Sequence, residues 1–172
     1  ETGIEFIERD YEYAGYFQGG LAIIVKEEKF GYINKFGEHQ IEPQFESANN
    51  FVNGLAIVEL KGKYGLINRN GRFIFECKYD DLGSFSEGLV YAELNGKYGY
   101  YDRSGELVIE HQYDDAYDFN DGVAKVENEN KQGYINQEGL VVVPMIYEEI
   151  RPYFDTMYVF QEDGKYGLIN HK

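Results

Sequence analysis

Apolar and polar residues alternate over short stretches of this chain, and the alternation is broken by turn residues. Leu55 to Glu59 alternates, meets Lys61-Gly62, and is followed by the run Lys63 to Asn68. Alternation with a period of two, interrupted by a two-residue turn, is typical of a β-hairpin. The corresponding turn in the next stretch is Asn95-Gly96, the strongest short hairpin signal. The pattern therefore predicts antiparallel strands.

Two further elements follow each hairpin. Asn68 to Gly71 has an amide residue first and glycine fourth, which suits a type I turn leading into a residue with positive φ. A third strand is expected at Arg72 to Glu76, Glu106 to Glu110 and Leu140 to Val143. Tyr79, Leu82 and Phe85 are spaced by three, which fits an irregular fourth strand or a short helical turn, and we favour the strand.

The same pattern returns every 34 residues. A version of the motif Lys-aromatic-Gly-Leu/Tyr-Ile-Asn, with Tyr101-Asp102 in the third copy and Gln132 in the fourth, recurs with its glycine at the following positions: Gly31, Gly65, Gly99, Gly133 and Gly167. Repetition at a fixed period indicates stacked structural repeats, none of which can bury its apolar face alone. We therefore divide a single repeat domain into units at about 17–50, 51–84, 85–118, 119–152 and 153–172, the last completed by 1–16.

The two ends of the chain each hold part of one repeat unit, which favours a closed ring of repeats over an open array. Residues 1–16 align with the half-unit that 153–172 lacks, since Gly3 aligns with Gly37 and Ile7 with Ile41. Pairing the two ends would remove the exposed sheet edges that an open array leaves. The sequence thus predicts an all-β, closed five-bladed β-propeller-like ring with terminal closure, and the alternative is an open β-solenoid or array.

The repeated motifs resemble those of the WG (KWG) repeat family of bacterial proteins. The resemblance rests on Gly-Leu-Ala-x-Val, on Gly-Lys-aromatic-Gly-Leu-Ile-Asn and on Tyr-Asp-Asp-Ala-x-x-Phe, and it covers essentially the whole chain. Tyr, Phe or Gln132 stands where the family has its name-giving Trp. The resemblance implies a bacterial repeat protein, often secreted or at the cell surface, without an established common catalytic activity.

The composition of the chain excludes some classes of binding partner. The net charge of −15 repels phosphate backbones and anionic membranes, so we expect no nucleic acid and no membrane insertion. Cys77 is the only cysteine, which excludes a disulfide framework and favours a packing role for its side chain. Glu1-Thr2-Gly3 and Lys172 resemble residues left by a secretion vector, which favours a secreted or cell-surface location.

Recurring charged positions are better explained by structure than by chemistry. Each motif lysine can form an anion-binding collar in a ring, or can pair with a cross-strand carboxylate such as Glu59, Glu93 or Glu127, and we favour pairing. The acidic positions, among them Glu46, Asp80 and Asp114, could serve acid–base chemistry or bind Ca²⁺. Because they recur in every unit, we expect no enzyme, no metal and no cofactor.

Positions at which the repeats differ are the better candidates for function. An aromatic residue whose repeat-mates are polar is expected to lie exposed. This comparison selects as ligand-binding candidates Tyr13, Tyr16, Phe36, Tyr91, Tyr117 and Phe154. Tyr13, Tyr16, Tyr117 and Phe154 share one segment of the repeat, which predicts a common rim.

The sequence therefore predicts a non-enzymatic, monomeric binding module that recognises a protein partner, for instance in adhesion, through an aromatic and acidic rim. A carbohydrate-binding, lectin-like domain and a structural repeat spacer are the alternatives. An acid–base glycan hydrolase is disfavoured, because no acidic pair departs from the repeat pattern.

Overall fold

The structure is a computed structural model, and it describes residues 10–154 and 157–170. The chain divides into two compact units, residues 1–80 and residues 81–172. All regular elements of the described residues are β-strands, and every pairing between them is antiparallel. The prediction of an all-β repeat fold is confirmed.

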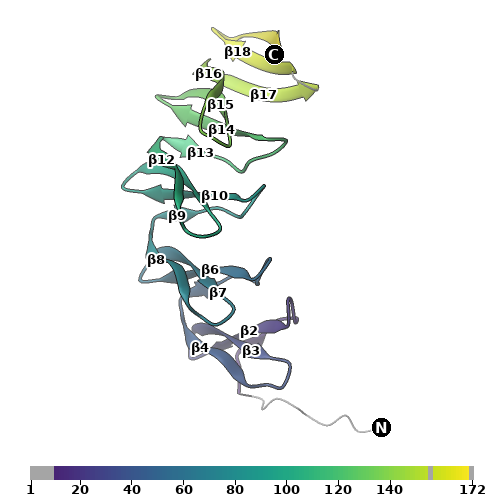
Figure 1. Ribbon diagram of the computed structural model, residues 1–172, viewed down its shortest axis with the longest axis vertical. Helices are drawn as coiled ribbons and strands as arrows, with labels where there is room; N and C mark the ends of the chain where they lie inside the picture. Colours follow the sequence, from purple (N-terminus) through teal and green to yellow (C-terminus); the bar gives the residue numbers. More distant parts are fainter. Residues whose placement is uncertain (1–9, 155–156, 171–172) are drawn as a thin grey trace. The chain divides into compact units, whose positions relative to one another are not determined.

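The first unit holds two four-stranded sheets. One sheet consists of β1 (Tyr13–Ala14), β2 (Leu21–Lys26), β3 (Lys29–Asn34) and β4 (His39–Phe45) in that order. The other consists of β5 (Ser47–Ala48), β6 (Leu55–Leu60), β7 (Lys63–Asn68) and β8 (Phe73–Tyr79). In Figure 1 each sheet is formed by strands that follow one another along the chain.

The second unit holds three sheets. The strands β9 (Asp81–Leu82), β10 (Leu89–Leu94), β11 (Lys97–Asp102) and β12 (Leu107–Tyr113) form one of them. The next contains β13 (Asp115–Ala116), β14 (Val123–Asn128), β15 (Lys131–Asn136) and β16 (Val141–Tyr147). The last sheet has three strands, β17 (Glu149–Phe154), β18 (Met157–Glu162) and β19 (Lys165–Asn170).

The turns form where the sequence predicts them. Asn95 and Gly96 both have positive φ, 56° and 77°, and they join β10 to β11 as a two-residue hairpin turn requires. At the next turn, the Asn68 side-chain oxygen accepts bonds from the backbone N–H groups of Asn70 and Arg72, at 3.0 and 3.1 Å. Gly71 adopts a φ of 74° there. Local turn chemistry thus fixes the hairpins.

The segment around Leu82 is a strand, as expected, but it opens a sheet rather than closing one. Asp81 and Leu82 pair with Glu93 and Ala92 of the following hairpin. The hydrogen-bonded sheets therefore begin a few residues before the sequence units, and this short first strand links consecutive sheets. The third strand predicted in the second, third and fourth units becomes the fourth and last strand of its sheet.

The repeated glycine allows the last two strands of a sheet to approach closely. A Cβ atom on Gly99 would lie 2.6 Å from the carbonyl oxygen of Ile109 and 2.9 Å from the nitrogen of His111. The pairing of β11 with β12 shifts its register at this point, and Gly31, Gly65 and Gly133 show the same approach. Only glycine fits such a position without moving the neighbouring backbone.

Consecutive sheets within a unit pack through aromatic side chains. The ring of Tyr32 lies 4.7 Å from that of Phe51 and its hydroxyl donates to the Asn49 carbonyl oxygen at 2.6 Å. In the second unit, Tyr100 repeats this arrangement with Phe119 and the Tyr117 carbonyl oxygen. Both tyrosines are fully buried. The core is therefore a series of sheet-to-sheet layers, as stacking of the repeats requires.

Ring closure and the single domain stay predictions. Among the described residues, the first four sheets each have four strands, the last has three, and no strand pair joins the first sheet to the last. Gly167, the counterpart of Gly99, meets the ring of Phe160 where the other sheets have the backbone of a fourth strand. No helix of the described residues is long and apolar enough to cross a membrane.

Candidate functional site

Three of the six predicted binding residues, Tyr91, Tyr117 and Phe154, lie in the second unit. Tyr117 is partly exposed, and its hydroxyl donates to the Asp115 carboxylate at 2.9 Å. The ammonium of Lys125 lies 4.0 Å from the centre of the Tyr117 ring, within the range of a cation–π contact. Burial, together with the Asp115 carboxylate, raises the pKa of Tyr117 to about 12.

Tyr117 borders a cavity of about 300 Å³ between the fourth and fifth sheets. Polar groups on its wall are Asp118, Asn120, Lys125 and Arg151, and its apolar wall consists of Val123, Tyr134, Ile150 and Pro152. A cavity with a few convergent polar groups on an apolar wall is the usual form of a small binding site.

The polar groups of this cavity have unused binding capacity. No described residue forms a hydrogen bond or ion pair with the Asp118 side chain, and burial raises the pKa of this carboxyl group. The described ion pairs likewise include neither Lys125 nor Arg151. The cavity therefore offers a carboxylate acceptor and two cations beside an aromatic ring.

Tyr91 lies next to this site and is half-buried, so the expectation that it is exposed was wrong. Its ring packs against Tyr98 at 5.9 Å and lies over Gly83, where a Cβ atom would come within 2.4 Å of it. Burial raises the pKa of Tyr91, and the nearby carboxylates of Asp81, Asp118 and Asp115 raise it further. Tyr91 and Tyr117 therefore border the same acidic region.

Phe154 is 73% exposed at the end of β17, two residues beyond Pro152 of the cavity wall. The second unit thus carries three of the predicted residues around or beside one cavity.

The other three predicted residues belong to the first unit and are exposed there. Tyr16 is 95% exposed and Tyr13 56%. Phe36 lies in the turn after β3, with the Lys35 ammonium 5.0 Å from its ring centre. The common rim for Tyr13, Tyr16, Tyr117 and Phe154 stays a prediction.

The motif lysines pair with carboxylates, but not with the ones expected. Lys97 contacts Asp114 at 2.5 Å and Lys63 contacts Asp80, while Lys29–Glu46 and Lys131–Glu148 are separated by 3.9 Å. The expected partners, Glu59, Glu93 and Glu127, lie opposite Tyr64, Tyr98 and Gln132 instead. The reason is register, since pairing of Tyr64 with Tyr79 places Asp80 beside Lys63.

Two of these carboxylates, Glu46 and Asp114, also bind the next hairpin. Glu46 accepts a bond from the Gly62 N–H at 2.9 Å, and Asp114 accepts one from the Glu129 N–H at 2.7 Å. The Gly62 N–H lowers the pKa of Glu46, and Lys97 with the Glu129 N–H lowers that of Asp114. Glu46 and Asp114 thus each join a lysine of one sheet to the hairpin of the following sheet. Among the described residues, no three His, Cys, Asp or Glu are grouped to hold a metal ion.

Gln132 is the one polar residue at the repeat position of the motif aromatic, and its side-chain amide forms two hydrogen bonds. Its amide nitrogen donates to Glu127 at 3.2 Å, and its oxygen accepts from the Ile150 N–H at 3.2 Å. The residue therefore ties the fourth sheet to the fifth.

Sequence reasoning did not select Asp118, Asn120, Lys125 and Arg151 as site residues. The signal was present in the comparison of repeats, since Arg151 is the repeat-mate of Tyr117 and Lys125 is the repeat-mate of Tyr91. A polar residue that occupies the same repeat position as an exposed aromatic residue is expected to lie on the same surface as that aromatic residue.

The fold and site define a β-propeller-like repeat protein. Two structures of Hsv2 from Kluyveromyces lactis are similar to it in fold, each with a TM-score of 0.50. The identities are 11% and 12%, and the similarity covers 88% and 97% of this chain but only 56% and 59% of the Hsv2 chains. The chain therefore spans less than two thirds of their length.

The family follows from the repeats themselves. The model of the WG containing repeat matches residues 2–30, 30–64, 64–98, 98–131 and 133–166. The chain belongs to the WG-repeat family. A search of curated proteins finds no match.

Proposed function

We propose that this chain is a non-enzymatic binding module that recognises a protein partner through aromatic and acidic surface residues. The observation that carries the proposal is the cavity beside Tyr117, in which an aromatic ring, an unpaired carboxyl group and two cations converge. Protein interfaces are rich in tyrosine and arginine, and the residues that dominate binding cluster around such pockets.

The proposed partner is a protein that inserts one anchoring side chain into the cavity. The net charge of −15 favours a partner with a basic surface, since long-range attraction would speed the encounter. Tyr91 and Phe154 would contact the partner beside the anchor. A location outside the cell or on its surface is part of this proposal and rests on the family resemblance.

Binding to a panel of purified cell-surface ectodomains tests the proposal. Changing Tyr117 and Phe154 to Ser should abolish binding and leave the melting temperature unchanged, because neither ring belongs to the buried core. A matched control is Leu140→Ser, which removes another exposed apolar side chain outside the cavity. Binding that survives the double change, or is lost equally in the control, would refute the proposal.

Carbohydrate binding is the second candidate. It is favoured by the combination of a tyrosine ring with the Asp118 carboxyl, the Asn120 amide and the Arg151 guanidinium, since sugars stack on aromatic faces and bond to such groups. Screening on a glycan array separates the two functions: retention of a sugar that requires Asp118 and Tyr117 would select this alternative.

A further inference from the structure

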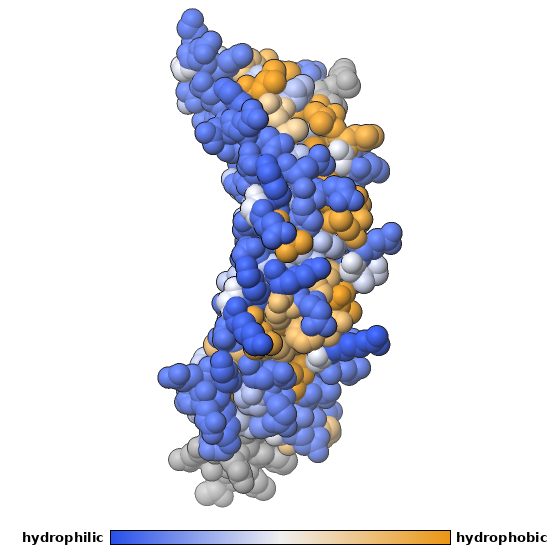
Figure 2. Space-filling model, turned by 90° about the vertical axis from the view of Figure 1, so that its left-hand side faces the viewer, coloured by the Kyte–Doolittle hydropathy of each residue, from blue (hydrophilic) through white to orange (hydrophobic). Residues whose placement is uncertain are grey.

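The last sheet exposes a face that every other sheet buries. Leu168 is 56% exposed, whereas its repeat-mates Tyr32, Leu66, Tyr100 and Tyr134 are at most 6% exposed. Tyr166 shares the face with Leu168, because side chains alternate along a strand, and it is 64% exposed. With Tyr153 these residues line an open apolar cavity of about 450 Å³. In Figure 2 hydrophobic side chains reach the surface at the top of the view, where the last sheet lies.

The first sheet exposes the opposite half of the same interface. Phe17 is 49% exposed. Two of its repeat-mates, Phe51 and Phe119, are 4% and 2% exposed, whereas a third, Tyr153, is 65% exposed. Phe51 and Phe119 are covered by the tyrosine rings of the preceding sheets, Tyr32 and Tyr100. Phe17 has the same side chain at the same repeat position, and the ring pairs of the described residues do not include it.

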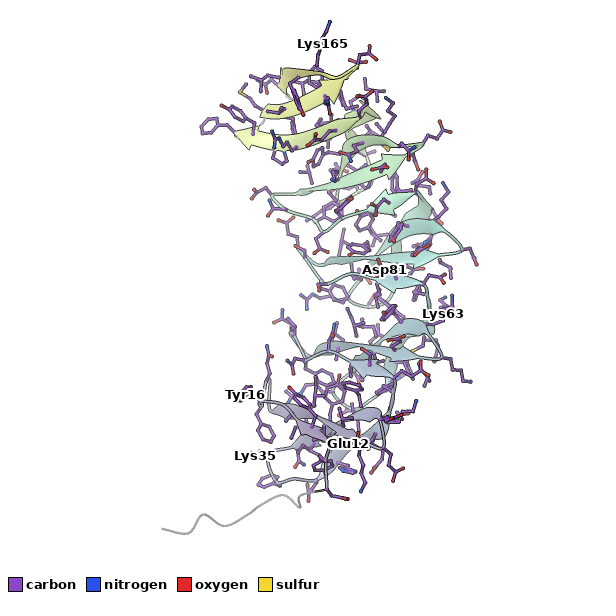
Figure 3. The ribbon with its side chains drawn as sticks, turned by 180° about the vertical axis from the view of Figure 1, so that it is seen from behind. Glu12, Tyr16, Lys35, Lys63, Asp81 and Lys165 are labelled. Carbon is purple, nitrogen blue, oxygen red and sulfur yellow. The ribbon has the colours of Figure 1, made fainter. Side chains whose placement is uncertain are left out.

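Charged groups show the same mismatch at the two ends. The Glu12 carboxylate accepts bonds from the N–H groups of Glu27 and Glu28, as Glu46 and Asp114 do from their hairpins. Unlike Glu46 and Asp114, Glu12 has no lysine partner among the described residues, and Lys165 has no carboxylate partner among them. Figure 3 labels Glu12 on the first sheet and Lys165 on the last.

We propose that these two faces bind each other between molecules, so that the last sheet of one copy stacks on the first sheet of a second copy. Leu168 then covers Phe17 as Tyr32 covers Phe51, and Lys165 pairs with Glu12 as Lys97 pairs with Asp114. Leu66, buried at the position of Leu168, shows that leucine suits it.

The contact joins two different faces, so it is heterologous and leads to a head-to-tail chain of copies. Stacking a second copy needs only the geometry that already relates neighbouring sheets within each unit. Closing the two faces within one molecule would in addition require the rotations between repeats to sum to a full turn. The proposal departs from the monomer expected from the sequence, and it is independent of the site beside Tyr117.

Sedimentation of the full chain over a wide range of concentrations tests the proposal. The wild-type mass should rise with concentration without stopping at a dimer. Leu168→Asp and Phe17→Ser should each remain monomeric with unchanged melting temperature, because both side chains are exposed. The control Leu140→Asp, another exposed apolar side chain, should associate as the wild type does.

Mixing the two variants gives the decisive result. Leu168→Asp retains an intact first face and Phe17→Ser an intact last face, so a mixture should form one-to-one dimers and nothing larger. Lys165→Glu should weaken association about tenfold, and adding Glu12→Lys should restore it. A wild type that stays monomeric at all concentrations would overturn the proposal. So would a mixture without dimers, or a loss of folding in Phe17→Ser, which would indicate a ring closed within one molecule.

Discussion

Replacing Gly99 with alanine should destabilise the second unit through a clash with backbone. The new Cβ would lie 2.6 Å from the Ile109 carbonyl oxygen and 2.9 Å from the His111 nitrogen, both on the neighbouring strand β12. Contacts this short require the strands to separate, and overpacking of this kind costs about 1–3 kcal/mol. Alanine also restricts the unfolded chain, which returns about 0.4–1 kcal/mol. The expected net loss is about 1–2 kcal/mol.

Urea denaturation of the wild type and the variant measures this loss, provided that the slope with denaturant stays the same. Gly167→Ala is the matched control, because the three atoms nearest to its Cβ would belong to the ring of Phe160, a side chain that can turn aside, and not to backbone. It should therefore lose less stability. If Gly99→Ala is as stable as the wild type, or if Gly167→Ala loses more, close strand approach does not explain the repeated glycine.

Two further predictions concern buried hydroxyls and exposed carboxylates. Tyr100→Phe removes the donor to the Tyr117 carbonyl oxygen and should cost about 1–2 kcal/mol in urea denaturation, whereas a neutral result would show that this bond adds nothing. Asp114 has a lowered pKa in the folded state, so its contribution is present above its unfolded pKa of about 3.9 and is lost as pH falls through the folded value. The stability difference between wild type and Asp114→Asn should be small, constant above about pH 4 and smaller below it; a difference that grows on acidification would contradict the pairing.

The repeat pattern predicted the strands well because it records local chemistry. Glycine and asparagine at fixed offsets specify the turns, and alternation specifies the buried face of each strand, so the hairpin at Lys61-Gly62 and the turn at Asn68 form as expected. For the four motif lysines with a described partner, the expected carboxylate was wrong. Glu59 pairs with Tyr64 in the hairpin and so lies on the opposite face from Lys63, and a register shift opposite the glycine brings Asp80 beside Lys63 instead. Alternation alone does not reveal such a shift.

The candidate site was predicted only in part. Comparing repeat-mates found the exposed aromatics Tyr117 and Phe154, since exposure follows from polar mates. The cavity itself depends on how the fourth sheet packs on the fifth, where Arg151 and Pro152 replace residues of the other repeats. This packing does not recur every 34 residues, so the repeat pattern of the sequence could not predict the cavity.

The most direct test of the central claim, that repeated residues build the fold and divergent residues bind the partner, is binding by Tyr117→Ser. Its affinity for a captured ectodomain should be measured beside its melting temperature. The account predicts a loss of binding with unchanged melting. Unchanged affinity, or binding and folding lost together, would contradict it.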